Sequence, residues 1–298
     1  MVRLSGAYYD ERNCRLCPRR CGADRTAKAG RCGGGNRPKV AKAMLHMWEE
    51  PCISGTRGAG AVFFSGCPLR CIFCQNAHIS RDNFGREITT ERLAEIFGEL
   101  EKKGAHNIDL VSPTHYAPYI REAMDMADVT VPYVYNSGGY DGDAPLDFME
   151  GKVKIFLPDL KYMSSEASAR LSGAPDYFEV AKRTIGRMVK IAGRVETDGD
   201  GLLKKGVVIR HLVLPGMRHD SIALMRWIKA EFGDDVLVSI MSQYTPVAGV
   251  PREINRKLTT FEYKSVTDVA EDLGIRGYTQ ERTSAKEEYT PDFDLSGV

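Results

Sequence analysis

The sequence predicts an α/β protein, built as a partial (β/α)6 barrel with a Cys-rich N-terminal extension. Six short apolar, β-rich runs occur from residue 61 onward, and amphipathic stretches of helical length alternate with them. Strands buried on both faces read as continuous apolar runs, and their alternation with helices is typical of parallel βαβ units. All eight cysteines lie within residues 1–74, which sets the N-terminal part apart. A doubly wound sheet is the alternative architecture.

The predicted elements follow the chain in a regular order. The predicted strands are 61–65, 107–112, 131–136, 153–158, 207–214 and 236–241. The predicted helices are 90–104, 116–128, 176–193, 220–233 and 261–274. Thr90 and Asp220 stand at two helix starts, where short polar side chains cap free N–H groups, so we expect them to be N-caps. Residues 39–53 are expected to form an extended pair or a single strand.

Composition limits the class of protein. Apolar residues make up 43% and charged residues 27%, as in ordinary globular chains. Lys and Arg number 41 against 40 Asp and Glu, so charge provides no case for binding nucleic acid or an anionic membrane. No run of about 18 apolar residues and no apolar secretion signal is present, so we expect no membrane segment and a cytoplasmic location.

We expect three segments along the chain. Residues 1–55 form a Cys-rich extension that binds a metal or an iron–sulfur cluster, because this polar, Gly-rich stretch has little apolar core of its own. Residues 56–275 form the barrel. Residues 276–298 form a polar, peripheral tail.

Three cysteines follow the first predicted strand directly. Cys67, Cys71 and Cys74 have C-x3-C-x2-C spacing. Reactive groups of β/α barrels gather in the loops that follow the strands. Three thiolates on one loop can hold three irons of a [4Fe–4S] cube, and the fourth iron is then open to another ligand. The alternative is a zinc site with His78 as its fourth ligand, since structural zinc usually takes four protein ligands.

Four further cysteines precede the barrel: Cys14, Cys17, Cys21 and Cys32. Four thiolates suit either a closed zinc site or a second [4Fe–4S] cluster. Ten residues separate the last two cysteines, which fits paired zinc knuckles imperfectly, so we place an auxiliary cluster that relays electrons slightly ahead of zinc. Three arginines beside these thiolates would offset their charge: Arg15, Arg19 and Arg20. Cys52 has no assigned role and is expected to be a small buried hydrophobe.

The loop of Cys67, Cys71 and Cys74 resembles the signature of the radical S-adenosylmethionine (radical SAM) superfamily. Over most of residues 39–275 the chain resembles the pyruvate formate-lyase activating enzymes and related putative activating enzymes with an extra N-terminal Cys region. Asp159-Leu160-Lys161 resembles their Asp-Leu-Lys, and Arg210 followed by Leu214-Pro215-Gly216 resembles their Arg…Pro-Gly strand ending. The resemblance therefore implies a partial barrel of radical SAM type.

The resemblance also implies a chemistry. SAM would bind the open iron, and one electron would split it into methionine and a 5′-deoxyadenosyl radical that abstracts hydrogen. The implied partners are an electron donor of flavodoxin or ferredoxin type and a glycyl radical enzyme as the substrate. Another peptide or a small molecule is the alternative substrate. A non-enzymatic iron–sulfur or zinc module is a third, remoter hypothesis.

The resemblance assigns further residues by position. The expected catalytic residues are Lys161, Arg210 and His115, and the expected cofactor-binding residues are Phe73, Ser112, Thr114, Asn136, Ser137 and Asp159. The alternatives are a core aromatic at Phe73, a satisfied polar residue at His115 and an internal ion-pair network of Asp159, Lys161 and Arg210.

The chain departs from the activating enzymes at three strand ends. Ser112-Pro-Thr-His115 stands where they have Gly-Gly-Glu, Tyr135-Asn-Ser-Gly138 replaces Asp-Thr-Asn-Gly, and Tyr244-Thr245 replaces a histidine. These departures weaken the case for activase-specific details more than the case for SAM binding.

Overall fold

The computed structural model describes residues 2–4, 7–280 and 291–298, and seven parallel strands of these residues form most of one sheet. They are β4 (Ala59–Phe64), β6 (Ile108–Val111), β7 (Tyr133–Ser137), β8 (Val153–Pro158), β10 (Leu203–Leu212), β11 (Leu237–Met241) and β12 (Gly277–Thr279). They lie in the sheet in chain order, and each pairs in parallel with the next. The described sheet is open at both ends, so the prediction of a partial α/β barrel is confirmed.

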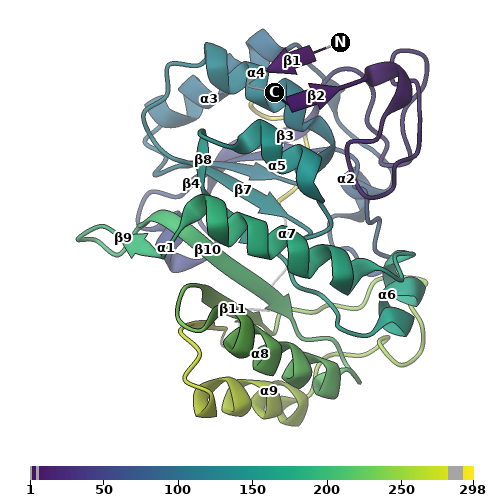
Figure 1. The fold of residues 1–298 in the computed structure, drawn as a ribbon, viewed down its shortest axis with the longest axis vertical. Helices are drawn as coiled ribbons and strands as arrows, with labels where there is room; N and C mark the ends of the chain where they lie inside the picture. The colour runs from purple at the N-terminus through teal and green to yellow at the C-terminus, as the bar shows by residue number, and fades with distance from the viewer. Residues whose placement is uncertain (1, 5–6, 281–290) are drawn as a thin grey trace.

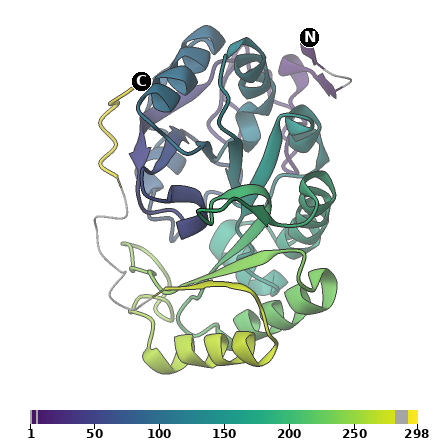
Figure 2. The ribbon, with the colours of Figure 1, turned by 90° about the vertical axis from the view of Figure 1, so that its left-hand side faces the viewer.

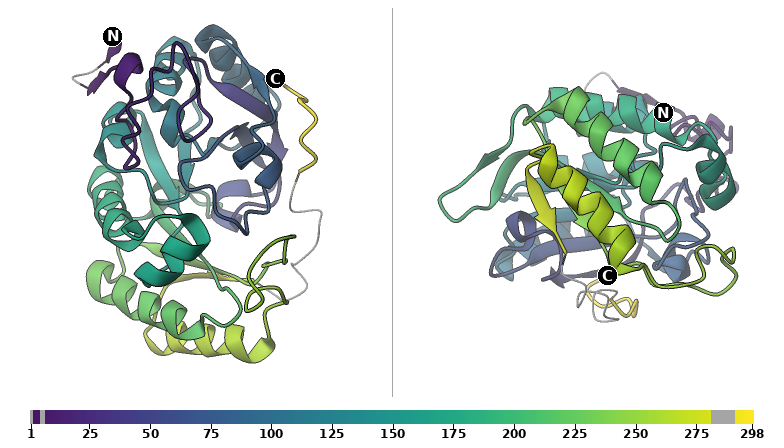
Figure 3. Two further views of the ribbon diagram at one scale, coloured as in Figure 1. Left: turned by 90° about the vertical axis from the view of Figure 1, so that its right-hand side faces the viewer. Right: turned by 90° about the horizontal axis from the view of Figure 1, so that it is seen from below.

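Helices cover one face of this sheet. Figure 1 shows α4, α5, α7 and α8 in a row over it, and Figure 3 shows α8 and α9 side by side. The longer helices are α3 (Thr90–Lys102), α4 (Ala117–Met126), α5 (Asp143–Met149), α6 (Ser165–Ser172), α7 (Tyr177–Ala192), α8 (Arg218–Phe232) and α9 (Thr260–Asp272). Their buried faces pack on the strands as one continuous apolar core. The short helix α1 (Pro51–Ser54) follows β3 (Lys39–His46). The short helix α2 (Ala77–Ser80) follows Cys67, Cys71 and Cys74, the barrel cysteines.

All six predicted strands are present, and each end lies within four residues of its expected position, but both predicted helix caps were wrong. Thr89, not Thr90, caps α3: its backbone is extended and its hydroxyl accepts the Arg92 amide at 3.2 Å. Asp220 lies inside α8, whose N-cap residue is Met217. An N-cap needs a non-helical backbone, which Thr90 and Asp220 do not have. Asp220 instead accepts the amides of Met163 and Ser164 at 3.0 and 2.8 Å.

Three antiparallel strands flank the parallel ones. β3 (Lys39–His46) is a single strand that pairs with β4, β5 (Arg86–Glu87) pairs with the start of β3, and β9 (Glu196–Thr197) pairs with β10. The last described residues run beside β3, where the Leu295 amide donates to Ala41 and the Ala43 amide donates to Ser296. Figure 2 shows this yellow segment along the outside of the sheet edge. It shields backbone groups that an open edge would expose.

The N-terminal extension is mostly turns, with a short hairpin of β1 (Val2–Leu4) and β2 (Ala7–Tyr9), and it docks where the barrel strands end. The Cys67 amide donates to the Cys32 carbonyl at 2.8 Å. Arg25, only 2% exposed, donates to the carbonyl of His115 at 2.6 Å and to the Tyr9 hydroxyl at 3.1 Å. The four N-terminal cysteines are therefore held beside the barrel cysteines.

Membrane-spanning helices are not found in the described part of the chain, where every helix is too short or too polar to cross a bilayer.

The contact at Gly66 provides a test of this docking. Its φ is +86°, and a Cβ there would overlap the Cys32 carbonyl oxygen and approach His115 Nε2 to 3.0 Å. We expect Gly66→Ala to lower the free energy of unfolding by about 1–3 kcal/mol, since both the backbone and the interface are strained. Chemical denaturation measures it. Gly98→Ala, in α3 with no atom within 4 Å of the new methyl, is the control and should not destabilise. An unchanged Gly66→Ala midpoint would contradict the docking.

Candidate functional site

The three barrel cysteines lie in the loop between β4 and α2. The hydroxyl of Ser172 donates to Cys71 Sγ at 2.9 Å, and that of Ser80 donates to Cys74 Sγ at 3.4 Å. Burial, together with the neighbouring Cys71 and Cys74 sulfurs, raises the pKa of Cys67 to about 12. Three neighbouring sulfurs, two of which accept hydrogen bonds from hydroxyl groups, are a ligand set that suits an iron–sulfur cluster, because hydrogen bonds to sulfur stabilise its thiolate ligands.

His78, the alternative fourth ligand, lies on α2. Its ring stacks on Phe84 with centroids 4.5 Å apart, and it lies 3.9 Å from the Asp82 carboxylate. The described residues contain no group of three or more His, Cys, Asp or Glu side chains close enough to hold a single metal ion.

The N-terminal cysteines form a second group of neighbouring sulfurs. Burial raises the pKa of Cys17 to about 12, and the nearby thiols of Cys32, Cys14 and Cys21 contribute in the same direction. A Cβ on Gly30 would lie 3.5 Å from Cys21 Sγ and 3.6 Å from Cys32 Sγ, so this glycine leaves room between two sulfurs. Four neighbouring cysteine sulfurs are a donor set that a [4Fe–4S] cluster takes, whereas the described side chains do not converge on a single metal ion. Of the three expected arginines, Arg19 donates to the barrel, to the carbonyls of Pro68 and Ser172, both at 2.9 Å.

A row of charged side chains leads from the barrel cysteines across the strand ends. Lys161 Nζ lies 2.5 Å from Asp159 Oδ2, and Arg210 Nε lies 3.0 Å from Asp159 Oδ1. Burial alone lowers the pKa of Lys161, but Asp159 and the sulfurs of Cys71 and Cys74 outweigh it and raise the pKa to about 12. Lys161 is therefore a cation beside the sulfurs, held by Asp159.

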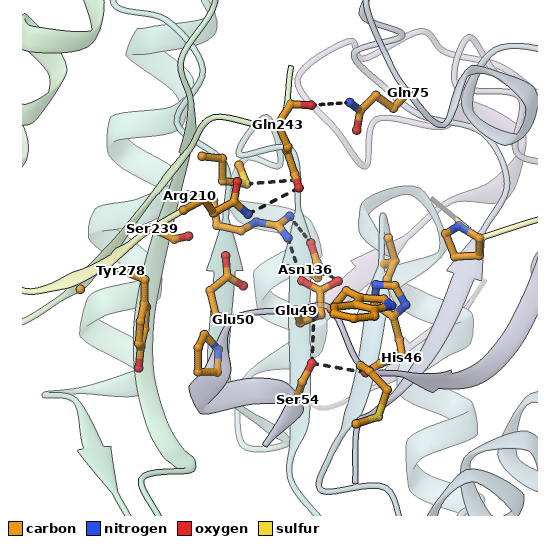
Figure 4. Close-up of a pocket in the computed structure, with 18 of the residues that line it drawn as sticks. His46, Glu49, Glu50, Ser54, Gln75, Asn136, Arg210, Ser239, Gln243 and Tyr278 are labelled. Atoms are coloured by element: carbon orange, nitrogen blue, oxygen red, sulfur yellow. Dashed lines mark hydrogen bonds and ion pairs between the residues drawn. The ribbon is translucent and has the colours of Figure 1, made fainter. Parts of the chain in front are cut away.

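Arg210 is the member of this row of charged side chains that lines a cavity of about 870 Å³ (Figure 4). Its guanidinium donates to Glu49 Oε2 at 3.0 Å and to Asn136 Oδ1 at 2.5 Å. Gln75, the residue after Cys74, also lines the cavity and donates to the Gln243 carbonyl at 2.9 Å. The cavity thus extends from the loop of barrel cysteines to Arg210 and the start of α1.

Two cavity residues were missed from the sequence, Glu49 and Glu50. Both precede α1, and burial raises the pKa of each carboxyl group. They are adjacent carboxylates at the end of a largely apolar segment, which is the one sequence signal that marks them. No spacing pattern in the sequence indicates that the segment with Glu49 and Glu50 turns toward Arg210.

The other expected site residues lie on the side of the N-terminal extension. His115 is 1% exposed, and its Nε2 lies 2.8 Å from the Ser65 carbonyl oxygen. Thr114 and Ser137 both donate to buried Asp141, at 2.5 and 2.7 Å, a carboxylate that the sequence analysis did not identify.

Ser112 and Phe73 have separate surroundings. Ser112 has a φ of +62°, and it lines a narrow hollow beside Cys67 together with Thr114. Phe73 is buried, with its ring centroid 6.3 Å from those of Tyr162 and Tyr244. The structure thus joins Lys161, Asp159, Arg210 and Asn136 in one row and places His115 outside the cavity lining.

The fold and the cysteine loop define a class of protein, the radical SAM proteins. The family model of the Radical SAM superfamily matches residues 61–228, more than half of the chain. The chain belongs to this superfamily, and membership implies a [4Fe–4S] cluster and SAM as cofactors.

Two relatives resemble the chain in sequence. Uncharacterized protein MJ0674 of Methanocaldococcus jannaschii is 28% identical over 276 residues, which cover 89% of this chain and 76% of that protein. The pyruvate formate-lyase-activating enzyme of Staphylococcus epidermidis is 22% identical over 199 residues, covering 62% of this chain and 74% of that enzyme.

Solved structures support the fold. A radical SAM methyltransferase from Sphaerobacter thermophilus superposes with a TM-score of 0.51 at 15% identity, covering 74% of this chain and 66% of that one. Streptococcus suis SuiB superposes with a TM-score of 0.50 at 15% identity, covering 80% of this chain. The chain spans about half the length of SuiB, 53%.

The buried histidine provides a pH test. Burial lowers the pKa of His115 from its ordinary 6.5 to about 3, so the folded protein keeps this ring neutral. As the pH falls from 6.5 toward 3, the unfolded chain binds a proton that the folded chain does not. The free energy of unfolding therefore falls by up to about 1.4 kcal/mol per pH unit on account of His115.

We expect His115→Gln to flatten the dependence of unfolding free energy on pH in this window, measured by denaturation at several pH values. Exposed His219→Gln is the control. An unchanged slope in His115→Gln would refute the assignment.

Proposed function

We propose that the protein cleaves SAM reductively at a [4Fe–4S] cluster held by Cys67, Cys71 and Cys74, and that its substrate loses a hydrogen atom in the cavity. When bound, the cluster and SAM supply one electron and a sulfonium C–S bond to split, which yields methionine and a 5′-deoxyadenosyl radical. One observation carries the proposal. Three neighbouring sulfurs follow β4, and a row of charged groups connects them to a cavity of about 870 Å³.

The chain's own residues have defined tasks in this proposal. Lys161 lies beside the sulfurs and offers an ammonium group to the SAM carboxylate. Asp159 holds Lys161 and Arg210 at fixed positions through its two oxygens. Asn136, on β7, presents its side-chain amide next to Arg210 of β10 across the intervening strand β8. Buried Phe73 and the aromatic residues around it limit the access of water to the cysteine loop.

A glycine of a glycyl radical enzyme is the first candidate substrate. It is supported by the similarity to the Staphylococcus epidermidis activating enzyme and by Asp159-Leu160-Lys161. The second candidate is another peptide or a small molecule. The lining of the cavity favours this second class, because a glycine within a polypeptide offers no charge to Glu49, Glu50 and Arg210.

For the N-terminal cysteines we propose a second [4Fe–4S] cluster, with a zinc ion as the alternative. The hydrogen bond from the Cys67 amide to the Cys32 carbonyl supports a role in electron transfer, because it joins the two cysteine groups directly. A flavodoxin- or ferredoxin-type donor in the cytoplasm would then supply the electron. None of the eight cysteines forms a disulfide, in keeping with a reducing compartment.

Cys71→Ala tests the proposed function. We expect anaerobic, reconstituted Cys71→Ala to lose its cluster on this loop and to form 5′-deoxyadenosine more than about 100-fold more slowly, since a missing ligand costs more than a missing outer-shell contact. Iron analysis and chromatography after addition of dithionite and SAM measure both. Cys52→Ala, another buried cysteine outside the site, is the control and should retain both. Undiminished cleavage in Cys71→Ala, or none in the unmodified protein, would refute the proposal.

Cys17→Ala tests the N-terminal site. We expect reconstituted iron to fall from about eight to about four atoms per chain, since one of two cubes is lost. SAM binding at the barrel cluster should persist. If zinc occupies the site, zinc content falls in place of iron. Metal content equal to that of the unmodified protein would exclude a four-thiolate site.

A further inference from the structure

Glu50 is a buried carboxylate that faces the cavity without a complete set of partners. Its side chain lines the cavity next to Arg210 and Ser239 (Figure 4). The residue is 8% exposed, and its Oε2 atom has no hydrogen-bond partner. It stands at the start of α1, where its carbonyl accepts the amides of Ile53 and Ser54 at 2.7 and 3.0 Å. The backbone therefore holds this carboxylate in place, and a buried unpaired oxygen is costly.

The cations near Glu50 are already engaged. Among the described residues that line the cavity, Arg210 is the one Lys or Arg side chain. Its guanidinium is shared among Asp159, Glu49 and Asn136. His46 also lines the cavity, but burial lowers its pKa to about 4, so the ring is neutral at pH 7. The lining therefore holds two carboxyl groups against one arginine, and an incoming cation would favour the ionised form of Glu50, whose pKa is raised by burial.

The surroundings of Glu50 favour an organic cation over a metal ion. Hard metal ions need several oxygens that converge on one point. No such group of three acidic or histidine side chains occurs within the described ranges 2–4, 7–280 and 291–298. The cavity instead has three aromatic residues in its lining, Trp48, Phe63 and Tyr278, and Trp48 is 52% exposed. Aromatic faces attract alkylammonium groups through their quadrupole.

We propose that the cavity binds its substrate through a primary ammonium group, with Glu50 as the anionic partner and Trp48 and Tyr278 beside it. This inference rests on the proposed function for the identity of the cavity as the substrate site, and it names the substrate class as an amine. The ammonium supplies the positive charge that the lining lacks, and it donates to the free Glu50 oxygen. Arg210 stays paired with Asp159 and Glu49.

The protein contains its own reporter for this binding. The sequence has two tryptophans, and the second, Trp227 of α8, packs against Phe178 of α7 and Phe232 of α8 and does not line the cavity. In a Trp227→Phe background, Trp48 emission reports on the cavity. The reconstituted protein with SAM is titrated anaerobically with 2-phenylethylamine, 2-phenylethanol and 3-phenylpropionate, which match in skeleton and differ in charge. We expect the amine to bind at least tenfold more tightly than the other two.

Variants assign the site to Glu50. We expect Glu50→Gln to weaken the amine at least tenfold and to leave the alcohol unchanged, whereas Glu166→Gln, on the exposed first turn of α6, changes neither. If Glu50→Gln does not fold, Glu50→Asp keeps the carboxylate and moves it one methylene closer to the backbone. This variant should also bind the amine more weakly. Equal binding of amine and alcohol to the parent protein, tighter binding of the carboxylate, or a folded Glu50 variant that binds the amine normally would overturn the proposal.

The two proposals fail separately. 5′-Deoxyadenosine formed without any amine measures SAM cleavage alone. Cleavage without amine binding refutes the ammonium site and leaves the proposed function standing. Amine binding without any cleavage refutes the proposed function and leaves a cation-binding cavity.

Discussion

The largely buried guanidinium of Arg210, whose side chain is 15% exposed, is the constraint on which the site depends. A buried charge is tolerated only when it is paired and hydrogen-bonded, and removal of a partner leaves a costly unpaired ion. Arg210 meets this condition by joining three strands and a loop, because its partners are Asp159 after β8, Asn136 on β7 and Glu49 after β3. The positions of Lys161 and of the cavity wall follow from this pairing. The same guanidinium thus connects the cysteine loop to the cavity.

The N-terminal extension and the barrel share a second buried cation. Arg25 lies within 6 Å of the ring centroids of Tyr9, Tyr116 and Tyr119, at 5.9, 5.4 and 5.8 Å, and it donates to the His115 carbonyl. These contacts hold Cys32 where its carbonyl accepts the Cys67 amide. The extension is therefore tied to the edge of the sheet where the parallel strands end, and two groups of sulfurs become neighbours. This proximity supports the proposal that the N-terminal group passes electrons to the barrel group.

The antiparallel strand β3 decides the chemical character of the cavity. It ends beside the start of β4, where His46 pairs with Ala59, and the chain then turns under the parallel strands. Glu49 and Glu50 enter the barrel from that end, while the cysteine loop lies at the other. A barrel of parallel strands alone would present only their own side chains. Here a segment that precedes the barrel supplies both lining carboxylates, and with them the charge that favours an amine.

The sequence by itself determined the six strands, the partial barrel and the cysteine loop after the first strand, because apolar runs and ligand spacing are local patterns. It also indicated that Lys161, Asp159 and Arg210 meet, since parallel strands share one carboxyl edge. The tertiary structure alone decided the positions of Arg25, Asp141 and Glu50, since each depends on contacts between segments distant along the chain. The position of His115 likewise depends on contacts between segments distant along the chain. The catalytic role of His115 stays a prediction, and its buried position depends on Arg25 and Ser65, which lie 90 and 50 residues away along the chain.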